Sequence, residues 1–215
     1  MLLSLRTSLA AAGLSLLFGV PLAWLLARAQ VPGKGLLRAL CALSMVLPPV
    51  VSGVVLFFSF GRRGLFGSWL YQWLGLRLPY SAAGVVVAQT FVAMPFLVLT
   101  VEAALRQQDE RLEDAARSLG ASRWMVFRRV TLPAVRPALT AGAVLAWGRA
   151  LGEFGATITF AGNAPGRTQT MPLAIYLALE SDPEAALVMS LLMVAVSLAI
   201  LLGLRQHWLG EGRRP

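Results

Sequence analysis

Long uncharged stretches alternate with short charged ones along this 215-residue chain. Four windows without Asp, Glu, Lys or Arg hold 21, 23, 24 and 20 residues, and they are 7–27, 39–61, 78–101 and 185–204. A bilayer core about 30 Å thick requires roughly 20 helical residues. A fifth window, 137–166, is interrupted only by Arg149 and Glu153. The pattern therefore predicts an all-α integral membrane protein with about five transmembrane helices.

Breaks and flanking residues refine these elements. We expect the first helix at about 7–27, the second at 37–60 and the third at 82–105. Pro48 and Pro49 stand in the middle of the second window, where the missing backbone donors predict a kink or a break. Between the second and third helices, tryptophan and tyrosine suit the headgroup zone and predict a short surface helix near Ser68–Leu74. No internal repeat is evident, so residues 1–215 are interpreted as a single transmembrane domain.

Composition and charge support the membrane assignment and orient the chain. Hydrophobic residues make up 57% of the sequence and charged ones 13%, too few to cover the surface of a soluble domain of this length. If residues 105–137 face the cytoplasm, the inner side carries thirteen Lys and Arg residues and the outer side five. The positive-inside rule then predicts a multi-pass membrane protein with the N-terminus outside and the C-terminus inside. The net charge of +9 is thus a topology signal and not a nucleic-acid-binding one.

Residues 105–137 form a polar segment between two apolar windows. Acidic residues from Asp109 to Asp114 favour the start of a short helix, since negative charge suits exposed amides there. Gly120 fits the left-handed position that ends such a helix. Ser122 is expected to cap a second short helix over about 123–129, which displays Trp124 and Phe127 on one face. We expect Leu132-Pro133 and Pro137 to close this unit and to start the fourth helix.

The spacing Asp114-Ala115-Ala116, three residues, Gly120, nine residues, Val130-Thr131-Leu132-Pro133 resembles the EAA loop of importer-type ABC permeases. Asp114 replaces the usual Glu and Val130 the usual Ile. The resemblance implies a type I ABC importer permease fold with cytoplasmic coupling helices that seat in an ATPase subunit. It implies coupling roles for Asp114, Ala115, Ala116, Gly120, Trp124, Phe127, Leu132 and Pro133. The alternative is an ordinary basic cytoplasmic loop.

Arg149 and Glu153 are unusual because ionisable groups are costly inside a membrane. A separation of four residues predicts that they share one face of the fourth helix and can pair. Such a pair is either a structural clasp or part of a path on which Arg149 meets an anion. The Thr157–Asn163 stretch that follows is interpreted as a polar turn ahead of a short apolar helix. Arg149, Glu153, Thr157, Thr159 and Asn163 are therefore the candidate path or gate residues.

Two stretches of the second half, 149–163 and 168–176, are similar to molybdate permease subunits. Sulfate permeases share the Ala-Leu-Gly-Glu-Phe-Gly portion, and tungstate remains an alternative cargo. The resemblance implies an importer of two permease copies, two ATPase subunits and an external oxyanion-binding protein. It assigns the path to this chain and ATP hydrolysis to its partner.

Other classes fit the sequence less well. No Gly-x4-Gly-Lys-Ser/Thr loop is present to cradle phosphates, and His207 is the single histidine, so no catalytic pattern for an intramembrane enzyme is found. No cofactor or metal site is expected. An ion-coupled secondary transporter is the remaining alternative, but such proteins usually show paired inverted halves, which five helices do not provide.

Overall fold

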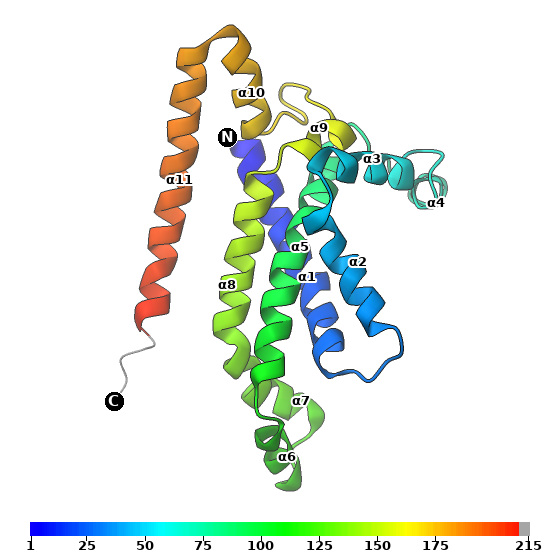
Figure 1. Ribbon diagram of the computed structural model, residues 1–215, viewed down its shortest axis with the longest axis vertical. Helices are drawn as coiled ribbons and strands as arrows, with labels where there is room; N and C mark the ends of the chain where they lie inside the picture. Colours follow the sequence, from blue (N-terminus) through cyan, green and yellow to red (C-terminus); the bar gives the residue numbers. More distant parts are fainter. Residues whose placement is uncertain (211–215) are drawn as a thin grey trace. The chain divides into compact units, whose positions relative to one another are not determined.

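The computed structural model describes the backbone of residues 1–210 and the side chains of residues 1–202, and within that range all regular elements are helices (Figure 1). In chain order they are α1 (Leu2–Arg28), α2 (Lys34–Val46), α3 (Pro49–Phe60), α4 (Gly67–Leu74), α5 (Ala82–Gln107), α6 (Glu110–Ser118), α7 (Arg123–Val126), the π-helical turn η1 (Phe127–Thr131), α8 (Leu132–Leu151), α9 (Gly155–Ala161), α10 (Met171–Ser181) and α11 (Pro183–Gly210). The predicted all-helical class is confirmed. Arg213 and Arg214, which contribute to the expected charge asymmetry, lie outside the described residues.

Four helical stretches of the described chain are long and apolar enough to cross a membrane, where the sequence suggested five. They are Leu2–Arg28, Ala82–Gln107, Arg123–Leu151 and Pro183–Leu202. The expected second span is divided at Leu47 and Pro48 into α2 and α3, each too short to cross alone. The break at the prolines is as predicted, because proline removes a helix donor and its ring crowds the preceding turn.

One compact unit comprises Leu9–Pro48 and Gln89–Ala150, which includes most of α1, α5 and α8 together with α2, α6 and α7. Leu97 lies fully buried at its centre. A Cβ added at Gly19 would come within 2.9 Å of Leu97 Cδ2, and one at Gly142 within 3.2 Å of Leu97 Cα. Glycine therefore allows α1 and α8 to approach α5 closely, which is how helices associate where lipid provides no hydrophobic driving force.

The other unit comprises Met1–Ser8, Pro49–Ala88 and the chain from Leu151 onward. Its densest packing is between α3 and α9. A Cβ on Gly53 would overlap Thr159 Oγ1 and lie 2.8 Å from the carbonyl oxygen of Ala156. A Cβ on Gly155 would lie 2.6 Å from Pro49 Cβ. The two short helices thus cross so closely that each requires a glycine.

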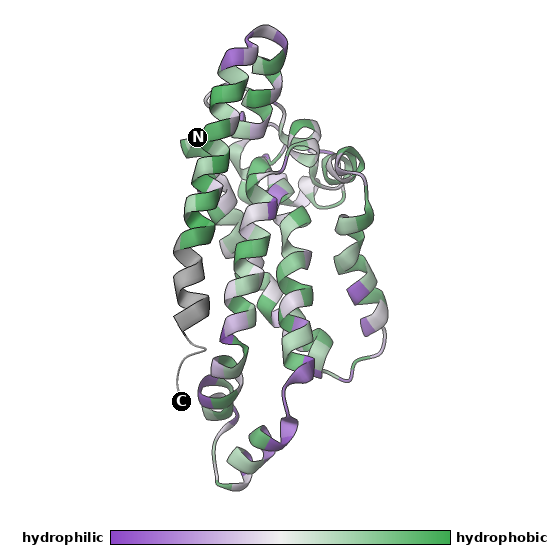
Figure 2. Ribbon diagram, turned by 60° about the vertical axis from the view of Figure 1, so that its left-hand side comes forward, coloured by the Kyte–Doolittle hydropathy of each residue, from purple (hydrophilic) through white to green (hydrophobic). Residues whose placement is uncertain are grey.

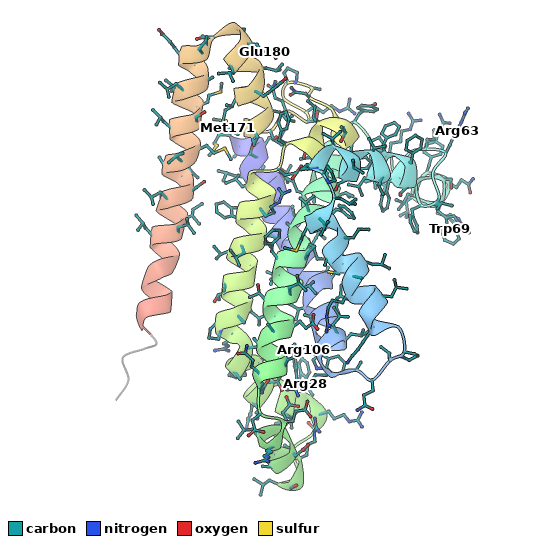
Figure 3. All side chains as sticks on the ribbon, in the orientation of Figure 1. Arg28, Arg63, Trp69, Arg106, Met171 and Glu180 are labelled. Carbon is teal, nitrogen blue, oxygen red and sulfur yellow. The ribbon has the colours of Figure 1, made fainter. Side chains whose placement is uncertain are left out.

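The same unit contains an α10–α11 hairpin that turns at Asp182. The N–H of Met171, at the start of α10, donates a 2.6 Å hydrogen bond to Ser4 Oγ near the start of α1 (Figure 3). Hydrophobic residues cover most of the described length of α11, whereas hydrophilic residues gather along α6 (Figure 2). Each side of the described part of α11 is therefore suited to lipid or to another apolar surface.

The predicted surface helix is confirmed as α4, which ends where Gly75 adopts φ +64°. Trp69 and Trp73 on this helix are 69% and 75% exposed, and their rings lie 5.9 Å apart. α4 therefore presents an uncovered aromatic face.

Candidate functional site

The polar segment 105–137 folds into two short helices at the end of α5 and the start of α8 (Figure 1). Asp109 begins α6 by accepting a 2.9 Å hydrogen bond from the N–H of Arg111. Gly120 adopts φ +85°, and the N–H of the next residue, Ala121, bonds back to Ala116 O at 3.1 Å. This is the glycine-terminated helix end that the sequence predicts.

The second short helix starts as predicted but ends differently. Ser122 Oγ accepts from the N–H of Met125 at 3.3 Å and so caps α7. The next span, α8, begins at Leu132 as predicted, but no break separates it from α7. Helical backbone continues from Arg123 to Leu151, widened into a π-helical turn over Phe127–Thr131. The wider turn is consistent with the sequence. The ring of Pro133 crowds the carbonyl of the preceding turn, and Pro133 has no backbone N–H to donate to that carbonyl.

Large apolar side chains are exposed on the polar segment. Trp124 and Phe127 stack with ring centroids 5.6 Å apart, so the two aromatics form one block as the spacing suggested. Trp124 is 68% exposed and Leu119 is 90% exposed, whereas Val126 is buried. Large apolar side chains are unusual on an otherwise charged segment and mark a surface for contact with another protein.

Glu113 holds α6 against the rest of its unit. It accepts a 2.9 Å hydrogen bond from Thr131 Oγ1 and pairs with Arg28 at 3.4 Å and Arg117 at 3.2 Å. The Glu113 side chain is 12% exposed, so these partners compensate the cost of removing a carboxylate from water. One carboxylate thereby joins α6 to the last residue of α1 and to the π-helical turn. Asp114, next to it, is exposed and pairs only locally with Arg117 at 3.1 Å.

A second buried carboxylate, Glu102 on α5, joins the neighbouring helices. It pairs with Arg38 of α2 and, at 2.9 Å, with Arg106 one turn further along α5. Arg106 also donates to the carbonyl oxygen of Leu26 on α1 at 3.2 Å (Figure 3). The ends of α1, α2 and α5 nearest the polar segment are therefore linked by charge-assisted hydrogen bonds. Neither network is predictable from the sequence pattern, because Arg28 and Arg38 lie 85 and 64 residues from their carboxylates.

A cavity of about 660 Å³ lies between α1 and the polar segment. Pro21 and Trp24 of α1 line one side of it, and Arg123, Trp124 and Phe127 line another. The Glu113 network thus holds the polar segment beside this cavity.

The candidate path residues are arranged differently from the prediction. Arg149 lies near the end of α8, but α8 ends at Leu151, and Glu153 lies in the connection before α9. The expectation that both occupy one helical face was wrong, and Gly152 at the break explains why. Glu153 is 1% exposed, and its carboxylate accepts a 2.7 Å hydrogen bond from the N–H of Ala156. This carboxylate therefore stabilises the start of α9.

Thr157 and Thr159 lie within α9 and not in a polar turn, which corrects a second expectation. Thr159 donates its hydroxyl to Gly155 O at 2.8 Å, so that group is used by its own helix. Among the side chains that the structure describes, Thr157 Oγ1 and Asn163 Oδ1 are buried without a hydrogen-bond partner. Such atoms are costly unless a ligand or water satisfies them. The short apolar helix expected after this stretch is confirmed as α10.

Metal ligands do not gather anywhere in the described part of the chain, where no three His, Cys, Asp or Glu side chains are placed to hold an ion.

Comparison with known proteins identifies similar sequences over nearly the whole chain. A family model described as "Binding-protein-dependent transport system inner membrane component" matches residues 19–209. The molybdenum transport system permease protein ModB of Escherichia coli (strain K12) is 44% identical over 210 residues, covering 98% of this chain and 92% of the relative. The protein of the same name from Mycobacterium tuberculosis (strain ATCC 25618 / H37Rv) is 47% identical, covering 94% of this chain and 76% of the relative.

A sulfate permease and a solved structure are also similar. The sulfate transport system permease protein CysT of Escherichia coli (strain K12) is 39% identical over 198 residues, covering 92% of this chain and 71% of the relative. The crystal structure of a bacterial ABC transporter involved in the import of the acidic polysaccharide alginate matches with a TM-score of 0.70 at 20% identity, covering 96% of this chain and 78% of that chain. At that identity the match supports the fold alone.

Proposed function

Because this chain belongs to the family of binding-protein-dependent transport system inner membrane components, we propose that it is the permease subunit of an ATP-driven molybdate importer. The observation that supports molybdate as the cargo is the 42–47% identity to ModB proteins over more than nine-tenths of the chain, against 39% identity to CysT. The chain is a transport subunit and not an enzyme. As a component of such a system it works with an ATPase and a substrate-binding protein.

The polar segment supports a coupling role in this proposal. The exposed surface of Ala115, Leu119 and Trp124 would enter a groove of the ATPase, and Gly120 sets the angle between α6 and α7. Asp114, whose side chain is 68% exposed, remains accessible for an ionic contact with the partner. Ala116, Phe127, Leu132 and Pro133 would shape the segment around that surface. Glu113 and Glu102 would then convey its movement to the ends of α1, α2 and α5.

The path is proposed to use uncharged donors. A dianion that enters a low-dielectric path needs compensating hydrogen bonds. Thr157 Oγ1 within α9 and Asn163 Oδ1 just after it are buried polar atoms without a hydrogen-bond partner among the described side chains. Thr159 and Glu153 would support α9 behind them, and Arg149 would add positive charge near the end of α8. We place two copies of this chain around a central path, with two ATPases and one external binding protein.

The orientation is tested by cysteine labelling in a variant that lacks the native Cys41. Single cysteines at Gly35 and Arg123 should react with a membrane-impermeant maleimide only from the cytoplasmic side. Those at exposed Gln72 and Gly166 should react only from outside, since thirteen basic residues on one side and five on the other favour that topology. External labelling at Arg123 would reverse the orientation and remove the ATPase from the polar segment.

The cargo is tested by uptake into vesicles that contain the permease, the ATPase and the binding protein. Labelled molybdate should accumulate only when ATP and the binding protein are both present. Tungstate should compete with it, while sulfate in equal amount should compete weakly. Efficient sulfate uptake that excess molybdate leaves unchanged would reject molybdate and favour the sulfate alternative. Uptake driven by an ion gradient without the ATPase would reject the importer class.

A further inference from the structure

Three arginines gather without a neutralising carboxylate in the connection between α3 and α5. A cavity of about 570 Å³ lies there, and its thirteen lining residues include Arg62, Arg63 and Arg77 but no Asp or Glu. In the part of the chain whose side chains are described, none of the three forms an ion pair. Positive charge of this density in a concave site favours an anionic ligand.

Tyr71 organises two of these arginines. The guanidinium groups of Arg62 and Arg77 lie 4.6 and 5.1 Å from the centre of its ring. Both also donate to its hydroxyl oxygen, at 3.4 and 3.2 Å. The hydrogen bond from Arg77 and the positive charges of Arg62 and Arg77 lower the pKa of Tyr71 from its usual range. Two cations are therefore held against each other's repulsion by one aromatic side chain.

An apolar face lies beside this basic cluster. Phe66, Trp69 and Trp73 are 58%, 69% and 75% exposed and line a second cavity on α4. Arg63 and Trp69 project from opposite sides of this segment (Figure 3). A short helix with an exposed tryptophan face, and with arginines in the loops on either side of it, is typical of elements that lie in the plane of a membrane surface.

We propose that segment 61–80 binds the phosphate headgroup of an anionic phospholipid through Arg62, Arg63 and Arg77, with the Trp69–Trp73 face of α4 against the acyl chains. Arginine suits this ligand because its planar guanidinium donates two parallel hydrogen bonds to phosphate oxygens. Tryptophan suits the adjacent depth because its ring is apolar and its N–H remains near the headgroups. A free anion would use the arginines alone and would leave the exposed aromatic face uncovered. The inference holds whichever oxyanion the protein imports.

The test is quenching of tryptophan emission in phosphatidylcholine vesicles that contain the full chain. A minor fraction of the lipid carries bromine, either on phosphatidylglycerol or on phosphatidylcholine. The signal is the excess quenching, defined as the quenching by brominated phosphatidylglycerol minus that by brominated phosphatidylcholine. A double variant in which Phe replaces both Trp69 and Trp73 identifies the share of the signal that comes from α4. We expect excess quenching by phosphatidylglycerol, with a preference of roughly fivefold for each arginine near the surface.

Matched variants separate the charge from a general effect on folding. A triple variant in which Gln replaces Arg62, Arg63 and Arg77 should lose the excess quenching by phosphatidylglycerol. The corresponding triple Lys variant should keep most of it. Arg167→Gln, which changes another exposed arginine in the same unit, should leave it intact. Equal quenching by the two lipids in the unmodified protein, or excess quenching that persists in the triple Gln variant, would overturn the proposal.

Two further arms distinguish other anionic ligands. Inorganic phosphate and molybdate are added separately at concentrations far above that of the lipid headgroup. If either abolishes the excess, the cluster binds small anions and the lipid assignment fails. Absence of a lipid preference, together with a triple Gln variant that needs more binding protein for half-maximal uptake, would assign the arginines to an acidic protein surface instead.

Discussion

Replacing Gly53 with valine is expected to abolish transport by forcing α3 away from α9. A β-carbon at this position would overlap Thr159 Oγ1 and lie 2.8 Å from the backbone oxygen of Ala156, so no side-chain rotation relieves the contact. Overpacking in a core typically costs roughly 1–3 kcal/mol, and contact with backbone brings the cost to the upper end or beyond. The purified variant should lose thermal stability, and uptake should fall to background.

Gly13→Val is the matched control, because a β-carbon on Gly13 of α1 meets nothing within 4 Å. Both variants place a β-branched residue in a helix, so their difference reports the close approach and not helix propensity. Gly53→Ala should be intermediate. Equal melting temperatures for Gly53→Val and Gly13→Val would show that the α3–α9 crossing is not as close as described.

Replacing Gly120 with valine should leave the protein inserted and folded but uncouple it from the ATPase. Gly120 has φ +85° and open space around it, so the penalty is backbone strain and not collision. The left-handed conformation costs a residue with a side chain about 1–2 kcal/mol, and more for a β-branched one. If α6 relaxes to avoid it, the surface around Leu119 and Trp124 changes shape. ATPase co-purification and ATP-driven uptake should then fall about tenfold or more.

Gly33→Val supplies the control for this prediction. Gly33 has φ +80°, an equally open surrounding and a position in the turn between α1 and α2, outside the polar segment. Its valine variant should suffer similar strain yet retain ATPase binding. A Gly120→Val protein that binds the ATPase and transports as well as Gly33→Val would contradict the coupling role of the polar segment.

Local chemistry made several features of the polar segment predictable from sequence. Asp109 and Ser122 are caps whose partners lie two or three residues away, and Gly120 is a residue that tolerates a left-handed backbone. The division of the second span at Pro48 follows from the same kind of argument, since proline acts on its own turn. Spacing within one turn of backbone was sufficient for all of these.

Features that depend on distant residues, or on where a helix ends, were predicted poorly. Glu113 and Glu102 gave no sequence sign of their partners in α1 and α2, because periodicity says nothing of which helix lies alongside. Arg149 and Glu153 have the spacing of a helical pair, but helix formation fails between them at Gly152. The carboxylate of Glu153 accepts a hydrogen bond from the N–H of Ala156 at the start of α9. Packing around α9 decides whether the helix continues past Gly152 or a side chain caps a new helix. The sequence pattern carries no information about that packing.

The absence of a break between Arg123 and Leu151 has a mechanical consequence. These 29 helical residues, at a rise of about 1.5 Å each, form a rod roughly 43 Å long. A hinged link would absorb a twist applied at Trp124, whereas a continuous rod passes it on to every turn up to Leu151. The π-helical turn at Phe127–Thr131 has weaker hydrogen bonding and is then the most compliant part of that rod. Nucleotide-driven motion of the partner would reach the membrane as torque about the axis of α8.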